Sequence, residues 1–337
     1  MFSYCENRFI VRTNQSITAD RKRRSGMEQK KGYLMVLAAG VMWGSIGLFT
    51  TELSQYVMSA GQIAFLRLAA GTVLLGVLLL VTKGRSAFRM DWRGLFWCVL
   101  LGIFAEALFN LSYTRAVTEA GMALGAVLLY TAPIFVSFMS WLFFRETFTK
   151  NKLIALGINV IGCALAVTGG NLAGLQIPAA GLAAGLAAGF FYGTFTIIST
   201  AALKEYDPLT VLFYGMLIGA VILGAVSRPW QILPQAANPR MLAVVAGFGL
   251  IPTCAAYALY MMGLSRKLET SKVPVICSIE IVAAALIGTA VLGQGMSFGK
   301  IAGILIILLS IILMNTELRK PEALRSGFRR PAARNRV

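Results

Sequence analysis

The chain has 337 residues, of which 57% are apolar and only 13% are charged. Soluble domains carry about 25% charged residues, so this composition argues against a soluble globular protein. Histidine is absent, which excludes histidine general bases, Ser-His catalytic triads and His-ligated zinc sites.

Ten apolar stretches follow one another along the chain. Each is about long enough to cross a ~30 Å hydrocarbon layer as a helix that rises ~1.5 Å per residue. Continuous apolar runs such as 301–314 do not alternate with polar residues, which argues against a β-barrel. The sequence therefore predicts an all-α integral membrane protein with ten transmembrane helices, at 33–51, 60–81, 94–113, 120–144, 152–168, 179–199, 209–226, 241–263, 273–292 and 298–315.

The distribution of basic residues explains the formal net charge of +17, because Lys and Arg near span ends are retained in the cytoplasm. If both termini are cytoplasmic, 26 of the 31 basic residues lie inside, four lie outside and Arg67 lies within a span. Both basic tails share a side only if the number of spans is even. We therefore predict a multi-pass protein of the plasma (cytoplasmic) membrane with both termini in the cytoplasm, and no nucleic-acid partner.

The N-terminal tail carries a run of four basic residues at 21–24. Attraction of such a run to anionic lipid headgroups is worth about 1 kcal/mol per basic residue, and a solvated tail is the simpler interpretation. The segment that begins at Met27, just before the first span, resembles the usual N-terminus of such a membrane protein. We therefore expect residues 1–26 to be dispensable. A cleaved signal peptide is not expected, because a full-length span follows the basic region without a small-residue cleavage site.

The sequence aligns with itself. At a shift of 149, residues 40–45 and 189–194 both read G-x-x-aromatic-G-hydroxyl, and at a shift of 148 Lys152 falls on Lys300. Each copy holds five spans, an odd number, so the second copy enters the membrane from the opposite face and the two form inverted repeats around a central site. The predicted organisation is a basic cytoplasmic tail at 1–31, a first repeat at 32–168, an external linker at 169–178, a second repeat at 179–316 and a basic cytoplasmic tail at 317–337.

Glycines and prolines occur at regular or unusual positions within the spans. Glycines recur every four residues along one face of the sixth span, at 181, 185, 189 and 193, and those at 32, 40 and 44 echo that face in the first span. Because small residues let helices approach closely, this pattern predicts tight packing or, alternatively, a sliding contact between moving bundles. Pro133 and Pro252 each remove a backbone hydrogen bond inside a span, which predicts helix kinks beside a cavity.

The five cysteines, at 5, 98, 163, 254 and 277, form no C-x-x-C pair. The last four lie in apolar segments, so we interpret them as small core residues rather than disulfides or metal ligands. No metal site and no cofactor are expected.

Three charged residues lie well within spans: Arg67, Glu106 and Glu280. Such a residue costs about 2.5 to 3.5 kcal/mol near the bilayer centre, so each needs a partner, a wet cavity or a neutral form. Arg67 and Glu106 fall at the same depth, ~10 Å below the outer boundary. They form either a buried ion pair that fixes adjacent helices, or the flanks of a cavity in which Arg67 meets a substrate carboxylate and Glu106 an amine.

Glu280 has no deep cation left to pair with. It is the first candidate for a group that binds a proton or contacts an amine, with Glu106 as the second, because burial favours the neutral form of a carboxylate. The alternative is a glutamate that is hydrogen-bonded to Ser278 or to a neighbouring helix, or that is wetted near the inner vestibule.

Aromatic and amide side chains complete the candidate cavity. Trp43 and its repeat mate Tyr192 fall near the middle of their spans, where an aromatic pair forms walls or gates. Asn110, Tyr130 and Tyr257 supply hydrogen-bonding groups in the same interpretation. For all five residues the alternative is ordinary packing, or an interfacial aromatic belt.

Together these motifs resemble the EamA family of the drug/metabolite transporter superfamily. The resemblance rests on G-x-x-W-G-S at 40–45, a Phe-x-Arg that ends at Arg67, and a proline-containing fourth span that ends in Arg145-Glu146. It covers about residues 30–316. It implies a secondary transporter of small metabolites or amino acids that frequently works as an exporter.

The second copy departs from the family pattern, because Glu280-Ile281 and Gln294 stand where a Glu-Pro pair and a closing Glu are frequent. The predicted function is alternating-access secondary transport that exports an amino acid or a related metabolite, with no enzymatic activity. The alternatives are a proton-coupled drug or amine antiporter, an integral membrane enzyme and a non-transporting scaffold. The expected partners are a small-molecule substrate and the lipid bilayer, and the chain acts as a monomer or a homodimer.

Overall fold

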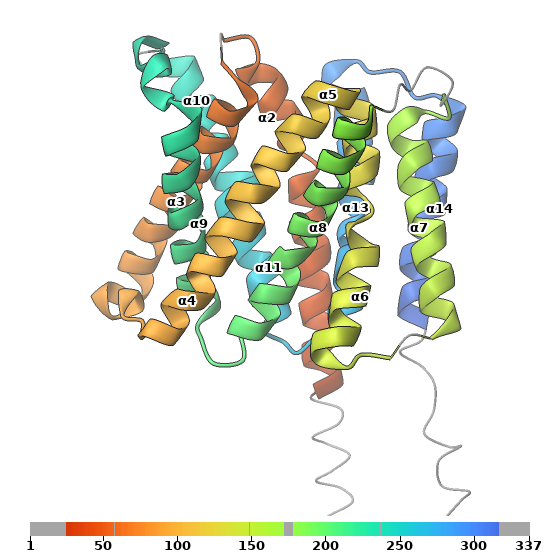
Figure 1. Ribbon diagram of the computed structural model, residues 1–337, viewed down its shortest axis with the longest axis horizontal. Coiled ribbons are helices and arrows are strands. Elements are labelled where there is room, and N and C mark those ends of the chain that lie inside the picture. Colours follow the sequence, from red (N-terminus) through yellow and green to blue (C-terminus); the bar gives the residue numbers. More distant parts are fainter. Residues whose placement is uncertain (1–24, 57, 148, 172–177, 236–237, 317–337) are drawn as a thin grey trace, which may run out of the picture.

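The computed structural model describes residues 25–56, 58–147, 149–171, 178–235 and 238–316, and within these ranges the chain is helical without strands. The helices run roughly side by side (Figure 1). The prediction of an all-helical membrane protein is confirmed. Among the described residues, eight helices are long and apolar enough to cross a bilayer, and two further apolar helices, Ala132–Phe144 and Phe298–Met314, are shorter. The eight are Ser25–Leu53, Ala60–Phe88, Trp92–Leu129, Lys150–Thr168, Ala179–Ala202, Pro208–Ser227, Pro239–Leu264 and Thr270–Leu292.

The first half starts with a helix over 25–43. Its further elements are α2 (Ile46–Leu53), α3 (Ala60–Lys83), η1 (Gly84–Phe88), α4 (Trp92–Leu100), the π-helical η2 (Leu101–Leu108), α5 (Phe109–Leu129), α6 (Ala132–Phe144) and α7 (Lys150–Thr168). Polar side chains fix several helix starts. Ser59 and Gln62 form a reciprocal capping box at α3, and Asp91 accepts the Gly94 amide at α4 over 3.0 Å. These caps satisfy backbone donors that a helix start leaves unpaired.

The second half contains α8 (Ala179–Ala202), α9 (Pro208–Ser227), η3 (Pro229–Gln235), α10 (Pro239–Phe248), the π-helical η4 (Gly249–Ala255), α11 (Ala256–Leu264), η5 (Thr270–Lys272), α12 (Val273–Cys277), α13 (Ile279–Leu292) and α14 (Phe298–Thr316). The helix over 25–43 begins and α14 ends at the same end of the bundle, at the bottom of Figure 1. We call this end the tail face and the other end the opposite face. Four free cysteines, at 98, 163, 254 and 277, are buried, which confirms them as small core residues.

The third and fourth predicted spans are divided differently from the expectation. Residues 92–129 form one helical run, interrupted at Gly121 by a φ of 82°. The following segment is broken again at Tyr130 and Thr131, before α6 begins. The predicted limits 94–113 and 120–144 were therefore wrong in detail, because the turn at Gly121 occupies a single residue with a left-handed backbone that glycine adopts without strain.

The irregularities of the two halves recur at a constant spacing. The π-helical segments begin at residues 101 and 249, which are 148 positions apart. Helix breaks at Tyr130 and Ser278 have the same spacing. So do the C-cap residues Arg145 and Gly293, which both have left-handed backbone angles. These features depend on backbone geometry rather than on residue identity, and they support an internal structural repeat.

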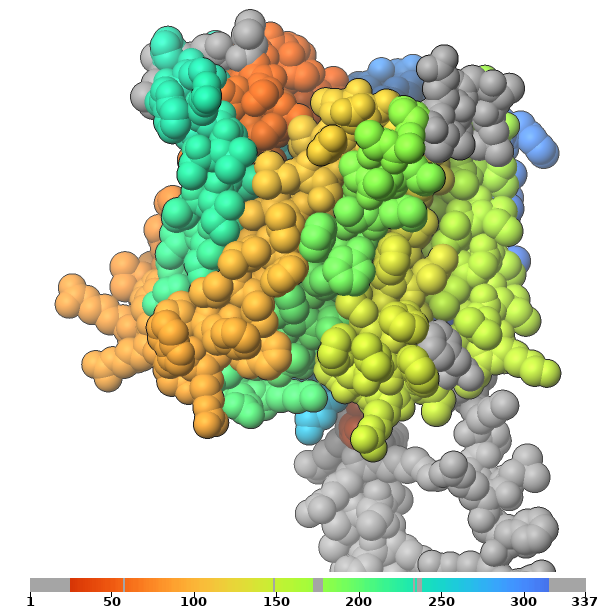
Figure 2. Space-filling view, in the orientation of Figure 1, coloured from red at the N-terminus to blue at the C-terminus, as the bar shows by residue number. Residues whose placement is uncertain are grey.

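In each half, a helix face of small residues packs against the other half beside its helix break, at Tyr130 or Ser278. A Cβ at Gly40 would meet Cys277 and Ile279, and a Cβ at Gly189 would meet Leu129 and Thr131. The other glycines of α8 pack likewise, Gly181 on Ala120, Gly185 on Leu128 and Gly193 on Val136. Their absent side chains allow close backbone approach. On the face shown in the space-filling view, side chains of α4, α5, α6 and α8 form a continuous surface (Figure 2).

The expectations for the terminal tails lie almost wholly outside the described residues. They include the basic run at 21–24, the dispensability of residues 1–26 and the basic C-terminal tail at 317–337.

Candidate functional site

Glu280 lies in the first turn of α13, directly after the break at Ser278. Its carboxylate accepts a hydrogen bond from the hydroxyl of Tyr130, at the matching break of the other half. Glu280, Tyr130 and Tyr192 are each only half-buried, so surface remains for a ligand. The side chains within electrostatic range of Glu280 are Tyr113, Cys163, Tyr192, Tyr257, Tyr260 and Cys277. Tyrosines from both halves are therefore near enough to interact electrostatically with this carboxylate.

A polar cluster braces the break that positions Glu280. The fully buried Asn159 of α7 donates to the hydroxyl oxygens of Ser278, over 2.7 Å, and Ser310, over 2.9 Å. The Ser278 hydroxyl in turn donates to the Val275 carbonyl over 2.6 Å. These bonds give the interrupted backbone and its polar groups partners inside the bundle, as a helix break at membrane depth requires.

Arg67 and Glu106 are neighbours but not a direct ion pair, so the paired interpretation is not what the structure contains. Glu106 is fully buried in η2, and neither carboxylate oxygen has a hydrogen-bond partner among the described residues. The Arg67 guanidinium carbon lies 5.9 Å from the ring centre of Phe248. The Asn110 side chain donates over 2.6 Å to the backbone carbonyl of Glu106 rather than to its carboxylate.

Tyr257 lies between the Arg67–Glu106 region and Glu280. It contacts Arg67 by a side-chain hydrogen bond and lies within electrostatic range of Glu106, Arg67 and Glu280. All three intramembrane charges that the sequence singled out therefore converge on one side chain of α11. One cation and two carboxylates are therefore near enough to influence the same tyrosine hydroxyl.

Trp43 and Tyr192 lie in two separate aromatic groups. The Trp43 ring packs against Tyr257 and Tyr260, with ring centres 5.1 and 5.2 Å apart, whereas Tyr192 packs against Phe109 at 5.4 Å. The helix is interrupted directly after Trp43, at Gly44 and Ser45. The two aromatic residues thus contact different aromatic partners and do not stack on each other.

The two prolines of the spans occupy different positions. Pro252 lies inside the π-helical η4, where its missing N–H fits a local change of helix register. Pro133 lies at the start of α6, directly after the break at Tyr130. At that place proline is favourable, because the first turn of a helix has no partner for the missing donor.

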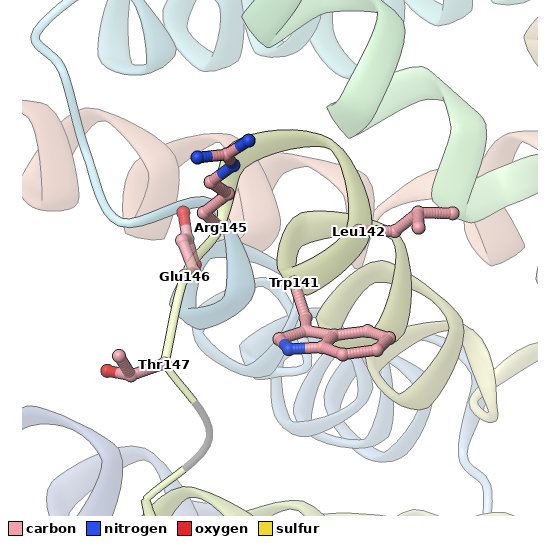
Figure 3. Close-up of a pocket in the computed structure, with 5 residues that line it drawn as sticks. All are labelled: Trp141, Leu142, Arg145, Glu146 and Thr147. Atoms are coloured by element: carbon pink, nitrogen blue, oxygen red, sulfur yellow. The ribbon is translucent and has the colours of Figure 1, made fainter.

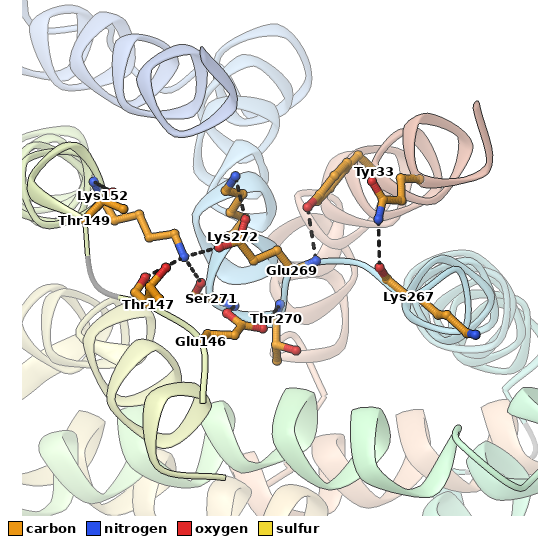
Figure 4. A network of polar contacts seen from close by, with 11 residues as sticks. Tyr33, Glu146, Thr147, Thr149, Lys152, Lys267, Glu269, Thr270, Ser271 and Lys272 are labelled. Atoms are coloured by element: carbon orange, nitrogen blue, oxygen red, sulfur yellow. Dashed lines mark hydrogen bonds and ion pairs between the residues drawn. The ribbon is translucent and has the colours of Figure 1, made fainter. Parts of the chain in front are cut away.

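A charged cluster at the tail face was not predicted (Figure 4). Glu146, after α6, accepts the Thr270 amide over 2.6 Å and the Ser271 amide over 3.0 Å. Lys152 of α7 bonds to Glu269 and donates to the Ser271 hydroxyl over 3.2 Å. Lys272 pairs with Glu269 at 2.6 Å. We call this set the tail-face clamp: Glu146, Lys152, Glu269, Thr270, Ser271 and Lys272.

The clamp joins the two halves of the chain through ion pairs to two buried lysines. The side chains of Lys152 and Lys272 are only 4% and 3% exposed. Burial by itself would raise the pKa of Glu269, but hydrogen bonds from both lysines outweigh it and place the pKa below its ordinary value. Sequence reasoning missed this cluster because basic residues beside span ends already had an explanation in membrane topology.

A hollow of about 520 Å³ lies beside the clamp, at the end of α6 (Figure 3). It is bordered by Trp141, Leu142, Arg145, Glu146 and Thr147. Trp141 and Leu142 are about half exposed, and a tryptophan at the end of a spanning segment is typical of the membrane interface. The hollow is a surface feature and is separate from the interior residues around Glu280.

Comparison with known proteins identifies the family. The profile of the EamA-like transporter family matches residues 30–168 and again residues 179–316. The chain belongs to the EamA-like transporter family. One relative, the Bacillus subtilis (strain 168) protein named "Uncharacterized transporter YwfM", is 27% identical over 85% of this chain and 94% of its own length. Another, from Salmonella typhimurium (strain LT2), is named "Uncharacterized inner membrane transporter YicL"; it is 25% identical over 86% of this chain and 97% of its own.

A solved crystal structure has the same fold as this EamA-family chain. It superimposes with a TM-score of 0.71 and 17% identity, over 86% of this chain and 99% of that one. Family and relatives together indicate a multi-pass membrane transporter of the drug/metabolite type rather than an enzyme. The family resemblance drawn from the sequence motifs is thus confirmed.

Proposed function

We propose that this EamA-family protein is a secondary active transporter that exports an amino acid or a related small metabolite by alternating access. One observation carries this substrate class: Tyr257 lies within electrostatic range of Arg67, Glu106 and Glu280. A zwitterion needs a cation for its carboxylate and an anion for its amine. Charges of both signs around one aromatic ring meet both needs in an interior where unpaired charge is costly.

In this proposal Glu280 receives the substrate amine and Arg67 receives the carboxylate. Glu280 has free surface beside its bond to Tyr130, and no carboxylate of the described residues forms a direct ion pair with Arg67. Glu106 is enclosed, with no hydrogen-bond partner among the described residues, so its role is electrostatic or that of a proton carrier. Glu280 is the other candidate for proton coupling. Trp43, Tyr192 and Asn110 shape the surrounding walls.

The proposed transport cycle uses ten spans. Eight of them are the longer helices, and the other two contain the shorter apolar helices Ala132–Phe144 and Phe298–Met314. Both chain termini are placed in the cytoplasm, since most basic residues then lie inside. Two inverted halves close either side of one chamber at similar cost, and this symmetry is what alternating access requires. One chain encloses the chamber, so a monomer suffices.

A drug or amine antiporter is the second candidate. Tyr113, Tyr130 and Tyr192 around Glu280 favour it, because aromatic rings attract ammonium groups and a lone carboxylate selects cations. Such a substrate would need Glu280 but not Arg67. The requirement for Arg67 therefore separates a zwitterion from a simple cation.

A ligand screen by thermal unfolding of the purified protein tests the substrate class. Amino acids, amines, sugars and organic acids are added one at a time, because a true ligand raises the midpoint by mass action. We expect stabilisation by one or more amino acids in the wild type, and its loss in Arg67→Met. Stabilisation by amines alone, unchanged in Arg67→Met, would support the antiporter instead. Counterflow of the stabilising solute in proteoliposomes then distinguishes a carrier from a scaffold.

A further inference from the structure

The tail-face clamp ties together the segments that must separate if the chamber opens at that face. Glu146 and Lys152 belong to the first half, and residues 269–272 belong to the second half. The Glu146 carboxylate holds two consecutive amides at the start of η5 and α12, the segment that leads to Glu280. Hydrogen bonds to an ionised group are about twice as strong as neutral ones. The clamp therefore fixes the lower part of a broken helix to the other half.

The same loop is also fastened to the first helix of the chain. The Glu269 amide donates to the Tyr33 hydroxyl oxygen over 3.2 Å, and Gln29 donates to the Lys267 carbonyl over 3.3 Å. Arg266 forms an ion pair with Glu28. The contacts of Tyr33 and Lys267 lie beside the clamp (Figure 4). Several independent elements thus close this end of the bundle.

The repeat offers a direct comparison with the opposite face, where the clamp has no counterpart. At the shift of 148, Glu146 corresponds to Gln294, and Lys152 corresponds to Lys300. Lys300 is half-buried and donates to the Gly295 carbonyl of its own half over 3.3 Å. The positions that match Glu269, Thr270, Ser271 and Lys272 are Gly121, Met122, Ala123 and Leu124. All four lack charge, and Met122 is 71% exposed.

The opposite face has an ion pair between the halves, but an exposed one. Arg240 and Glu52 lie 3.0 Å apart, with Arg240 71% exposed. Exposed pairs contribute little, because water competes for both charges. Removing one member of a buried pair, by contrast, leaves an uncompensated charge. Opening the tail face must disrupt buried charges. At the opposite face the ion pair is exposed, and the hydrogen bonds from Gln62 to the Arg228 carbonyl and to Gln231, over 3.4 and 3.3 Å, are neutral.

We propose that the protein rests with its tail face closed, and that release of Glu146 from the Thr270 and Ser271 amides is the step that opens this face. The inference rests on the proposed alternating access. With the tail face in the cytoplasm, the resting chamber opens outward. An exporter built this way loads its substrate only after the clamp opens, so the clamp controls access from the cytoplasm.

Thiol labelling from each side of the membrane tests the resting state. A cysteine at Tyr113, which lies within electrostatic range of Glu280, is introduced into a variant without the native cysteines. A membrane-impermeant maleimide is applied to right-side-out and to inverted vesicles. We expect labelling from outside, about tenfold slower labelling from the tail side, and an increase of about tenfold from the tail side in Glu146→Gln. The matched control, Glu52→Gln at the opposite face, is expected to leave the tail-side rate unchanged.

The outcomes separate the clamp from the transport proposal. The clamp proposal alone would be overturned if the protein with an intact clamp were labelled faster from the tail side than from outside. An unchanged tail-side labelling rate in Glu146→Gln would overturn it too. Labelling from neither side in any variant would contradict the chamber itself. Hydrogen exchange of the wild type needs no variant to fold: we expect slow exchange at Thr270 and Ser271 and fast exchange at Met122 and Ala123, and equal rates would refute the asymmetry.

Discussion

Replacing Glu280 with glutamine is expected to abolish counterflow while the protein still folds. The substitution keeps the size of the side chain and an oxygen that accepts the Tyr130 hydrogen bond, but it removes the negative charge. A hydrogen bond to a charged group contributes about 1.5 to 3 kcal/mol, so the loss of substrate affinity alone is about ten- to one-hundredfold. Counterflow of the solute identified by thermal unfolding measures the effect.

The control for Glu280→Gln is the same substitution at Glu119, an exposed acid. It is expected to leave counterflow and the thermal midpoint unchanged. If Glu280→Gln transports at the wild-type rate, Glu280 contacts neither the substrate amine nor a coupled proton. If only the pH dependence of transport disappears, Glu280 is the proton site and the amine is bound elsewhere.

Replacing Gly189 with leucine is expected to prevent correct assembly of the bundle. A Cβ at this position would lie 2.7 Å from the Thr131 hydroxyl and 2.9 Å from the Leu128 carbonyl, where the helix of the other half is broken. Backbone cannot move aside as a flexible side chain does, and overpacking a close contact commonly costs about 1 to 3 kcal/mol or more. The fraction of folded monomer in mild detergent measures the effect.

Gly157 provides the matched control for Gly189→Leu, because it lies in α7 with no heavy atom within 4 Å of a Cβ. Gly157→Leu is expected to behave like the wild type, since both substitutions add the same side chain to a helix. Equal folded fractions for the two variants would mean that the contact between α8 and the broken helix is not tightly packed, and the sliding interpretation of the glycine face would gain support.

Apolar length and the positions of repeated motifs predicted most of the fold. They gave the helical class and placed most spans within a few residues, because every backbone group in a bilayer must be satisfied within a helix. The division of residues 92–144 was not predictable in the same way. In the sequence, nothing distinguishes Gly121 from the other glycines of the apolar stretches. Only its φ of 82° shows that the chain turns there.

The sequence selected the candidate site residues but not the contacts between them. Counting residues along helices put Arg67 and Glu106 at one depth, but depth does not determine where side chains point, and Arg67 instead faces Phe248 and Tyr257. The partner of Glu280 on a neighbouring segment is Tyr130, which the sequence also selected. Contacts across the halves, such as Asn159 with Ser278, leave no pattern in the sequence.

The most direct test of alternating access is a reversible cross-link across the tail face. Thr147 and Ser271 both contact the Lys152 ammonium, over 3.0 and 3.2 Å, so cysteines at these positions in a variant without native cysteines can be joined by a short cleavable linker. We expect the cross-linked protein to lose counterflow and to regain it after cleavage, with both single-cysteine variants unaffected. Counterflow at the wild-type rate in fully cross-linked protein would contradict a chamber that opens to each side in turn.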